Sequence, residues 1–334
     1  MQDEGVSASG GRRALAPNGV MRKVLGVVLI VVIVAAGLAL AYLGKGLEDP
    51  WLGSVIRLPW GAVTIVETVA ALSFLIQFVA YVPAYVFQTE KFYDLTGSVT
   101  YLTCVWYSYA AGMRAMPDAG VRLRPTVTSC LVSIWALRLG SFLFRRVLED
   151  NGDSRFTEIK PNAVRFLVAW TLQGLWVFLT AFAVFVINAS TADSSLGVVD
   201  CVGIAVWALN FAVEVVADRQ KSWWRKQPEN KGKFIEYGLW YYSRHPNYAG
   251  EVLLWLGIFI IGAASLQGTQ WVTVISPIFV FSLIYFVSGV PMLEKKADQR
   301  WGGQRDYDNY KATTSVFFIL PKLGKRVREP LETP

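Results

Sequence analysis

The stretch SRHPNYAGEVLLWLGI, residues 243–258, marks the place where a polar loop becomes an apolar helix. Its first nine residues contain the only histidine of the chain, together with an arginine, an amide, a phenol and a carboxylate. Such groups are costly at the edge of hydrocarbon unless they have a partner or a function. We therefore expect this stretch to hold the functional site, at the surface of a membrane.

The rest of the chain has the composition of an integral membrane protein. Hydrophobic residues make up 54% of its 334 residues and charged residues only 17%, which is too apolar for an ordinary soluble enzyme. Apolar segments of membrane length predict an all-α, polytopic membrane helix bundle with about eight transmembrane helices, of which the third is short and polar. The predicted spans are roughly 24–43, 62–87, 98–112, 126–144, 164–188, 198–217, 249–266 and 270–290.

The distribution of basic residues predicts the orientation of the bundle. With the N-terminus in the cytoplasm, the cytoplasmic segments contain 26 of the 32 lysines and arginines, the outside loops contain five, and Arg138 lies inside the fourth span. This asymmetry satisfies the positive-inside rule, so both termini should be cytoplasmic. The net charge of +7 then reflects basic loops facing an anionic leaflet or an anionic ligand, and requires no nucleic-acid partner. We expect a multi-pass protein of a bacterial inner membrane or the endoplasmic reticulum.

Three regions are expected along the chain. Residues 1–20 have little to bury and should form a disordered tail, 21–90 should contain the N-terminal transmembrane helices, and 91–328 should form the membrane domain that carries the site. The apolar run 25–42 also has features of a signal peptide, whose cleavage would leave seven spans; we favour a retained helix. The three cysteines and single histidine provide no spacing for a metal site.

The motif at 243–251 has the features of a helix start that binds anions. Pro246 suits the first helical turn, which places His245 near the N-cap. The free N–H groups and positive dipole of a helix N-terminus attract phosphate or carboxylate groups. Arg244 adds a planar fork that matches phosphate oxygens.

The next turn of that helix offers polar groups for the rest of a nucleotide. Asn247 and Glu251 are four residues apart and share one helix face. Their side chains can hold a ribose hydroxyl or a carboxamide, and Tyr248 beside them can stack or donate a hydrogen bond. We interpret the motif as part of a nucleotide pocket. A purely structural anchor at the membrane interface is the competing interpretation, above all for the aromatic residues just before the motif.

Three polar segments, 145–165, 218–247 and 292–328, should share the cytoplasmic face and together cap a cavity between helices. In the last of them Glu294, Asp298 and Trp301 recur at helical spacing. This spacing predicts an amphipathic cytoplasmic helix.

These residues resemble a known family. The motif Arg-His-Pro-Asn-Tyr-x-Gly-Glu, followed by an apolar hairpin and a C-terminal helix that ends before Ile-Leu-Pro, resembles the steroid 5-alpha-reductase C-terminal superfamily. More narrowly, the chain resembles the membrane branch called domain of unknown function 1295, which also has the patterns seen here at Phe92–Ser98 and Asp153–Phe156. The resemblance covers about 90–325.

The resemblance implies a multi-helix membrane reductase that uses NADPH to reduce the C=C bond of a lipophilic enone in lipid metabolism. It assigns cofactor binding to the motif and the polar segments around it, with a contribution from the C-terminal helix. The residues that we expect to bind the cofactor are Arg155, Arg244, His245, Asn247, Tyr248, Glu251, Glu294, Tyr307 and Tyr310.

The substrate site is expected on the second span. Steroid 5-alpha-reductases place a glutamate directly after a glutamine in an early span, whereas Gln77 is followed here by Phe78, which puts a steroid substrate in doubt. Gln77, Tyr81 and Tyr85 recur every four residues and line one helix face. A tyrosine there can donate a hydrogen bond to the substrate carbonyl, so we name Tyr81 as the catalytic candidate, supported by Gln77 and Tyr85. A structural role for all three is an equally open interpretation.

Two other functions remain open from the sequence. Membrane methyltransferases of the isoprenylcysteine and phospholipid type, which use S-adenosylmethionine, share Arg-His-Pro-x-Tyr-x-Gly and a C-terminal glutamate. They are usually smaller, with fewer spans before the motif, and the additional segment around Arg155 suits a cofactor with three phosphates. A transporter or a scaffold without catalytic activity is the third class, although the chain contains no inverted repeat.

Overall fold

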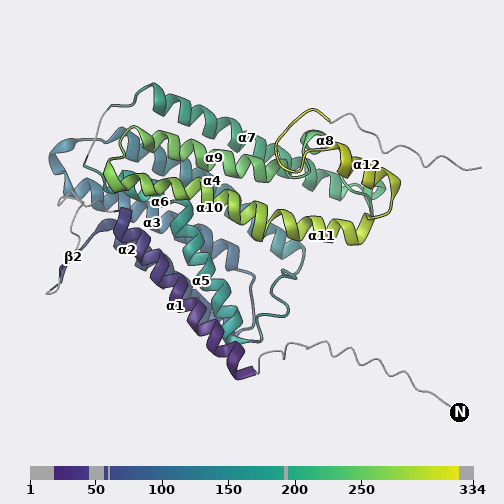
Figure 1. Cartoon of the computed structure of the whole chain (residues 1–334), viewed down its shortest axis with the longest axis horizontal. Coiled ribbons are helices and arrows are strands. Elements are labelled where there is room, and N and C mark those ends of the chain that lie inside the picture. Colours follow the sequence, from purple (N-terminus) through teal and green to yellow (C-terminus); the bar gives the residue numbers. More distant parts are fainter. Residues whose placement is uncertain (1–18, 45–55, 59–60, 192–194, 323–334) are drawn as a thin grey trace, which may run out of the picture.

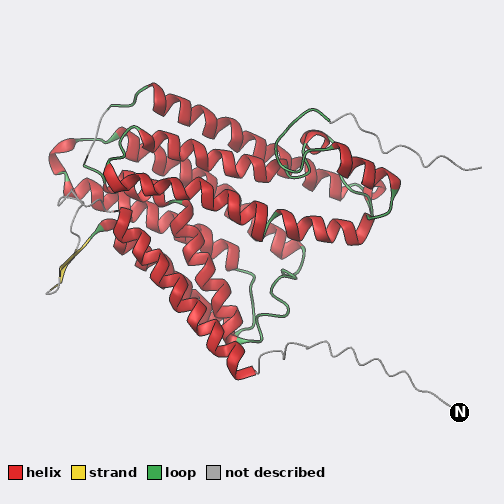
Figure 2. Ribbon diagram, viewed as in Figure 1, coloured by secondary structure: helices red, strands yellow, loops and turns green. Residues whose placement is uncertain are grey.

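The structure is a computed structural model that describes residues 19–44, 56–58, 61–191 and 195–322. The regular secondary structure of the described residues consists of helices and one short antiparallel hairpin, in which Ile56 pairs with Val63 (Figure 2). The expected all-α membrane bundle is therefore confirmed, with this hairpin as an addition. The predicted disordered tail lies outside the described residues up to residue 18, and Gly19 already belongs to the first helix.

The helices and strands follow one another along the described chain. In order they are α1 (Gly19–Gly44), β1 (Ile56–Leu58), β2 (Gly61–Val63), α2 (Ile65–Val86), α3 (Tyr93–Ala115), η1 (Pro117–Ala119), α4 (Leu123–Glu149), α5 (Ala163–Thr180), α6 (Phe182–Ala189), α7 (Val198–Lys226), η2 (Pro228–Asn230), α8 (Leu239–Tyr242), α9 (Pro246–Ala263), η3 (Gly268–Val274), α10 (Ile275–Ser282), η4 (Leu283–Val287), α11 (Val290–Trp301) and α12 (Arg305–Thr313).

Seven segments of the described chain are long and apolar enough to cross a membrane. They are Met21–Leu43, Ile65–Val86, Leu123–Glu149, Ala163–Thr180, Val198–Lys226, Pro246–Ala263 and Gly268–Trp301. The predicted third span, 98–112, lies within α3, whose 23 residues are long enough to cross but are more polar. Helix α3 packs against α2, α4, α5 and α6, so its polar side chains Thr100 and Ser108 are buried in protein and do not meet lipid.

Two groups of helices diverge from a common region (Figure 1). Helices α1, α2 and α5 pack together and run toward one end, whereas α7, α9 and α10 with α11 run toward another. The predicted fifth span, 164–188, is not one helix, because the chain breaks at Ala181 between α5 and α6. The last span contains a π-helical turn, Leu283–Val287, which leads from α10 into helix α11.

Helix α2 begins with a capping box formed by Thr64 and Glu67. The carboxylate of Glu67 accepts hydrogen bonds from the N–H and hydroxyl of Thr64, each at 2.9 Å. Such a box satisfies free backbone donors at the helix start, so Glu67 has a structural role.

Helices α7 and α9 approach each other at glycines. A methyl group on Gly250 would lie 2.8 Å from the carbonyl oxygen of Asn210 and 2.9 Å from the backbone nitrogen of Glu214. One on Gly257 would lie 2.7 Å from the backbone nitrogen of Trp207. Backbones in membranes come this close only where side chains are missing or small. The contact sets the register between the two helices that carry the site.

Substituting Gly250→Ala should therefore destabilise the bundle. The methyl group meets backbone atoms of α7 that cannot rotate away, and overpacking of this kind costs about 1–3 kcal/mol. This cost should outweigh the gain of roughly 1 kcal/mol in helix propensity. Thermal unfolding of the purified protein in detergent measures the effect as a lower melting temperature.

The matched control is Gly197→Ala, because a methyl group there meets its nearest neighbouring atom at 3.8 Å. This control should melt close to the parent protein. Equal melting temperatures for Gly250→Ala and Gly197→Ala would contradict the close contact between α7 and α9.

Candidate functional site

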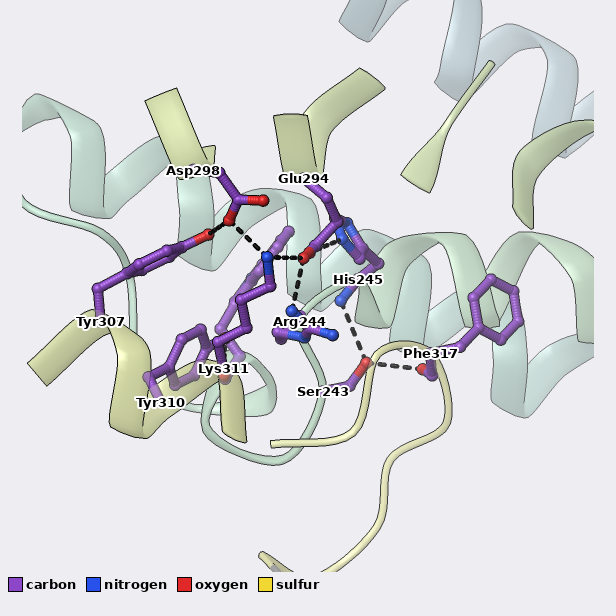
Figure 3. A network of polar contacts seen from close by, with 10 residues as sticks. Ser243, Arg244, His245, Glu294, Asp298, Tyr307, Tyr310, Lys311 and Phe317 are labelled. Carbon is purple, nitrogen blue, oxygen red and sulfur yellow. Dashed lines mark hydrogen bonds and ion pairs between the residues drawn. The ribbon is translucent and has the colours of Figure 1, made fainter. Parts of the chain in front are cut away.

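A cluster around Glu294 joins the start of α9 to α11 (Figure 3). The carboxylate of Glu294 pairs with Arg244 at 2.5 Å and with Nε2 of His245 at 2.8 Å. Lys311 of α12 approaches the same carboxylate at 3.6 Å and pairs with Asp298 at 2.5 Å. We call these five residues the Glu294 cluster. It brings together three of the residues expected at the cofactor site.

The segment after α11 is fastened onto this cluster by further hydrogen bonds. The hydroxyl of Tyr307 donates to Asp298 at 3.0 Å, and that of Tyr310 donates to the carbonyl of Trp240 at 2.7 Å. The backbone N–H of Arg244 donates to the carbonyl of Ser315 at 2.9 Å. Both predicted tyrosines are thus close to the motif, but their hydroxyl groups already have partners within the protein.

His245 is a buried, neutral imidazole in this setting. Burial lowers its pKa, against the opposing effect of its hydrogen bond to Glu294. Its ring stacks on Tyr248, with 5.7 Å between ring centres and 14° between planes. Because Nε2 faces a carboxylate, it carries the proton, which leaves Nδ1 as an acceptor. Nδ1 is buried and has no partner among the described residues.

A second polar cluster lies deeper, where α4, α7 and α9 meet. Arg138 of α4 pairs with Glu214 and Asp218, which are four residues apart on α7. The amide of Asn247 donates to Asp218 at 3.1 Å, whereas its own carbonyl oxygen is buried without a partner. Glu251 follows one turn later on α9 and forms no hydrogen bond with any residue that the structure describes. We call this set the α7–α9 cluster.

Arg155 lies in a third network, on the loop between α4 and α5. It pairs with Asp153 at 2.5 Å and approaches Asp94 of α3 at 3.8 Å. The same loop is tied to Glu90, which accepts from the Asp153 N–H at 3.0 Å and from Lys160 at 2.6 Å. Burial alone would raise the pKa of Glu90, but these donors hold it below its usual range. The two sequence patterns at Phe92–Ser98 and Asp153–Phe156 are thus packed together.

Gln77, Tyr81 and Tyr85, which were predicted to line the substrate site, lie on α2. Gln77 and Tyr81 already form hydrogen bonds within the protein. The hydroxyl of Tyr81 donates to the carbonyl of Ala163 at the start of α5 at 3.0 Å, and its ring stacks on Tyr85. Gln77 is fully buried and donates to Thr100 at 2.8 Å. The side-chain oxygen of Gln77 has no partner among the described residues.

Two cations near the motif were not singled out from the sequence. Arg146, near the C-terminal end of α4, has no hydrogen bond or ion pair with described residues, and its charge acts on Tyr248 and Lys221. Lys221, near the end of α7, forms no ion pair there either, and its ammonium lies 4.3 Å from the centre of the Trp240 ring. The sequence feature that could have identified these two cations is their position in the predicted cytoplasmic segments.

No group of three or more metal-binding side chains occurs among the described residues.

Comparison with known proteins places the chain in a family. Residues 80–314 match the model of a family described as a protein of unknown function (DUF1295), which belongs to the steroid 5-alpha-reductase-like superfamily. A fission yeast protein, "Uncharacterized protein C594.04c" of Schizosaccharomyces pombe, is 24% identical over 168 residues. That match covers 42% of this chain and 48% of the relative, about half its length. No solved structure matches the chain. Because the family model covers well over half of its residues, the chain belongs to the DUF1295 family of membrane proteins.

Proposed function

We propose that the protein is an NADPH-dependent membrane ene-reductase that reduces the C=C bond of a lipophilic enone, steroid-like or another lipid. The observation that carries this proposal is a set of polar groups around one helix start that form neither a hydrogen bond nor an ion pair with the described residues. They are the carboxylate of Glu251, the carbonyl oxygen of Asn247, and the cations Arg146 and Lys221. Unpaired groups at a membrane interface are costly unless a ligand meets them.

The acceptors suit the nicotinamide and ribose part of the cofactor. Carboxylate and amide oxygens accept hydrogen bonds, and a carboxamide or a ribose hydroxyl donates them. Asn247 is held in place by its hydrogen bond to Asp218, so its free oxygen has a fixed direction. These features support the expected role of Asn247 and Glu251, with Tyr248 packed on His245 between them and the Glu294 cluster.

The cations suit the phosphates. Arg155 and Arg244 were the residues expected to contact phosphate, but each already pairs with a carboxylate, Asp153 or Glu294. Arg146 and Lys221 are therefore better candidates for direct phosphate contact, since no carboxylate neutralises them within the described chain. We assign Arg155 and Arg244 to positioning the loops around the cofactor.

NADPH, when bound, supplies the hydride. The chain's own task is to orient the two reactants and to exclude water. A substrate carbonyl needs a hydrogen-bond donor in a dry site, where one donor contributes about 2.7–4 kcal/mol to catalysis. Tyr81 remains our candidate, and its hydroxyl would exchange the carbonyl of Ala163 for that of the substrate.

Removing the acceptors should weaken cofactor binding. Asn247→Ala and Glu251→Ala each remove one hydrogen-bond acceptor worth roughly 1.5–3 kcal/mol, so NADPH affinity should fall about ten- to hundredfold. Titration of the purified protein with NADPH, followed by nucleotide fluorescence, measures the change. Glu229→Gln, which alters an exposed carboxylate of η2, is the matched control. Unchanged affinity in both site variants would remove these residues from the site.

Removing the unpaired cations should weaken binding through the phosphates. Arg146→Gln and Lys221→Gln should each lower NADPH affinity by about tenfold or more, because a hydrogen bond to a charged group is lost. The parent protein should bind NADPH more tightly than NADH. Arg225→Gln removes an exposed cation from the same end of α7 and should have little effect. A loss in Arg155→Gln without a loss in Arg146→Gln would return phosphate contact to the residue predicted from sequence.

A further inference from the structure

Three consecutive apolar residues near the end of the described chain point away from the protein. Phe318 is 48% exposed, Ile319 is 38% exposed and Leu320 is 50% exposed. A run of exposed apolar side chains is costly on a surface that faces water, and such patches mark places where a protein meets another molecule or a membrane. We call residues 318–320 the exposed run.

The residue just before the exposed run packs on the last membrane span. Phe317 is 2% exposed, and its ring centre lies 5.7 Å from that of Phe281 and 5.6 Å from that of Tyr285. Both partners belong to Gly268–Trp301, a segment long and apolar enough to cross a membrane. Phe317 therefore lies beside a membrane helix, among its apolar residues, although it follows the polar helix α12.

The exposed run is continuous with a surface that faces lipid. Phe286 and Val287, on the same span, are 64% and 65% exposed, so in a membrane they meet acyl chains. The ring centre of Phe286 lies 4.9 Å from that of Tyr285. On the other side, the ring centre of Phe318 lies 5.3 Å from that of Phe317. Because Tyr285 and Phe317 are themselves in contact, aromatic rings connect the lipid-facing residues of the span to the exposed run.

Contacts on both sides of the exposed run hold it at the edge of the membrane. The carbonyl of Phe317 accepts a hydrogen bond from the hydroxyl of Ser243 at 2.6 Å, just before α9 begins (Figure 3). On the other side, Lys322 pairs with Glu236, and its ammonium lies 3.9 Å from the centre of the Tyr241 ring. Irregular backbone is not tolerated in contact with the hydrocarbon core, whereas tyrosine and lysine side chains gather at the interface.

We propose that the exposed run is an anchor that inserts into the lipid leaflet where headgroups meet acyl chains. Phe318, Ile319 and Leu320 contact acyl chains there, while Lys322 and the backbone stay among the headgroups. Because the neighbouring carbonyl of Phe317 is bonded to Ser243, the anchor also sets the depth of the start of α9 relative to the bilayer. The anchor does not depend on the reaction that the protein performs.

Electron paramagnetic resonance of nitroxide labels, on the full chain in phosphatidylcholine vesicles, tests the anchor. Cys130→Ser and Cys201→Ser first remove the two exposed cysteines. Single cysteines for labelling are then introduced as Leu320→Cys in the exposed run, Val287→Cys on the lipid-facing side of the last span and Glu229→Cys on η2, an exposed polar control.

Oxygen concentrates in hydrocarbon and a water-soluble nickel chelate stays in water, so the ratio of their collision rates with the label reports its surroundings. The ratio of oxygen to chelate collisions at 320 should be severalfold higher than that at 229 and should approach that at 287. Phe318→Cys, labelled in the same way, should give the same result. A label at 320 that collides mainly with the chelate faces water, and one that collides with neither reagent is covered by protein; either result would overturn the anchor.

Discussion

The site depends on the close contact between α7 and α9. Lipid tails are as apolar as leucine, so membrane helices associate through close packing and polar contacts and gain little from the hydrophobic effect. Gly203, Gly250 and Gly257 supply that packing by removing side chains where the backbones meet. The register that results places Asn247 opposite Asp218 and Gly250 against Glu214. The position of the motif relative to α7 is a consequence of this one interface.

Around this interface, polar groups that pair with each other and polar groups that do not have different roles. The Glu294 cluster and the Arg155 network are satisfied within the protein and fasten α11, α12 and the loop after α4 to the bundle. Buried ion pairs add little net stability, but breaking one costs about 3–5 kcal/mol, so they fix positions more than they stabilise. Arg146, Lys221 and Glu251, on α4, α7 and α9, form no hydrogen bond or ion pair with the residues that the structure describes. That division suits a scaffold that holds a polar ligand at the surface of a membrane.

The sequence predicted the class of fold and the local structure of the motif well. Composition and apolar length are enough to identify membrane helices, and Pro246 does begin α9, with His245 as the N-cap. The helix predicted from Glu294, Asp298 and Trp301 is α11. The break at Ala181 was missed because no proline or charged residue marks it. The orientation of the bundle and the domain limits stay predictions.

Side-chain partners were harder to predict than helices. Arg138 was expected inside the fourth span, but its partners Glu214 and Asp218 follow only from knowing that its side chain reaches α7. The hydroxyls of Tyr307, Tyr310 and Tyr81 each donate to a residue at least nine positions away in sequence, which no local pattern reveals. Arg155 and Arg244 were expected to contact phosphate because of their charge and their place in the predicted polar segments. The carboxylates of Asp153 and Glu294 already form ion pairs with them.

The most direct test of this account is the identity of the small molecule that the protein retains. The full chain is extracted in mild detergent, purified, denatured and analysed for released nucleotides by mass spectrometry. The account predicts NADP in oxidised or reduced form from the parent protein, and much less of it from Glu251→Ala. Release of S-adenosylmethionine or S-adenosylhomocysteine instead would contradict the reductase and identify the unpaired groups of α7 and α9 as the site of a methyltransferase.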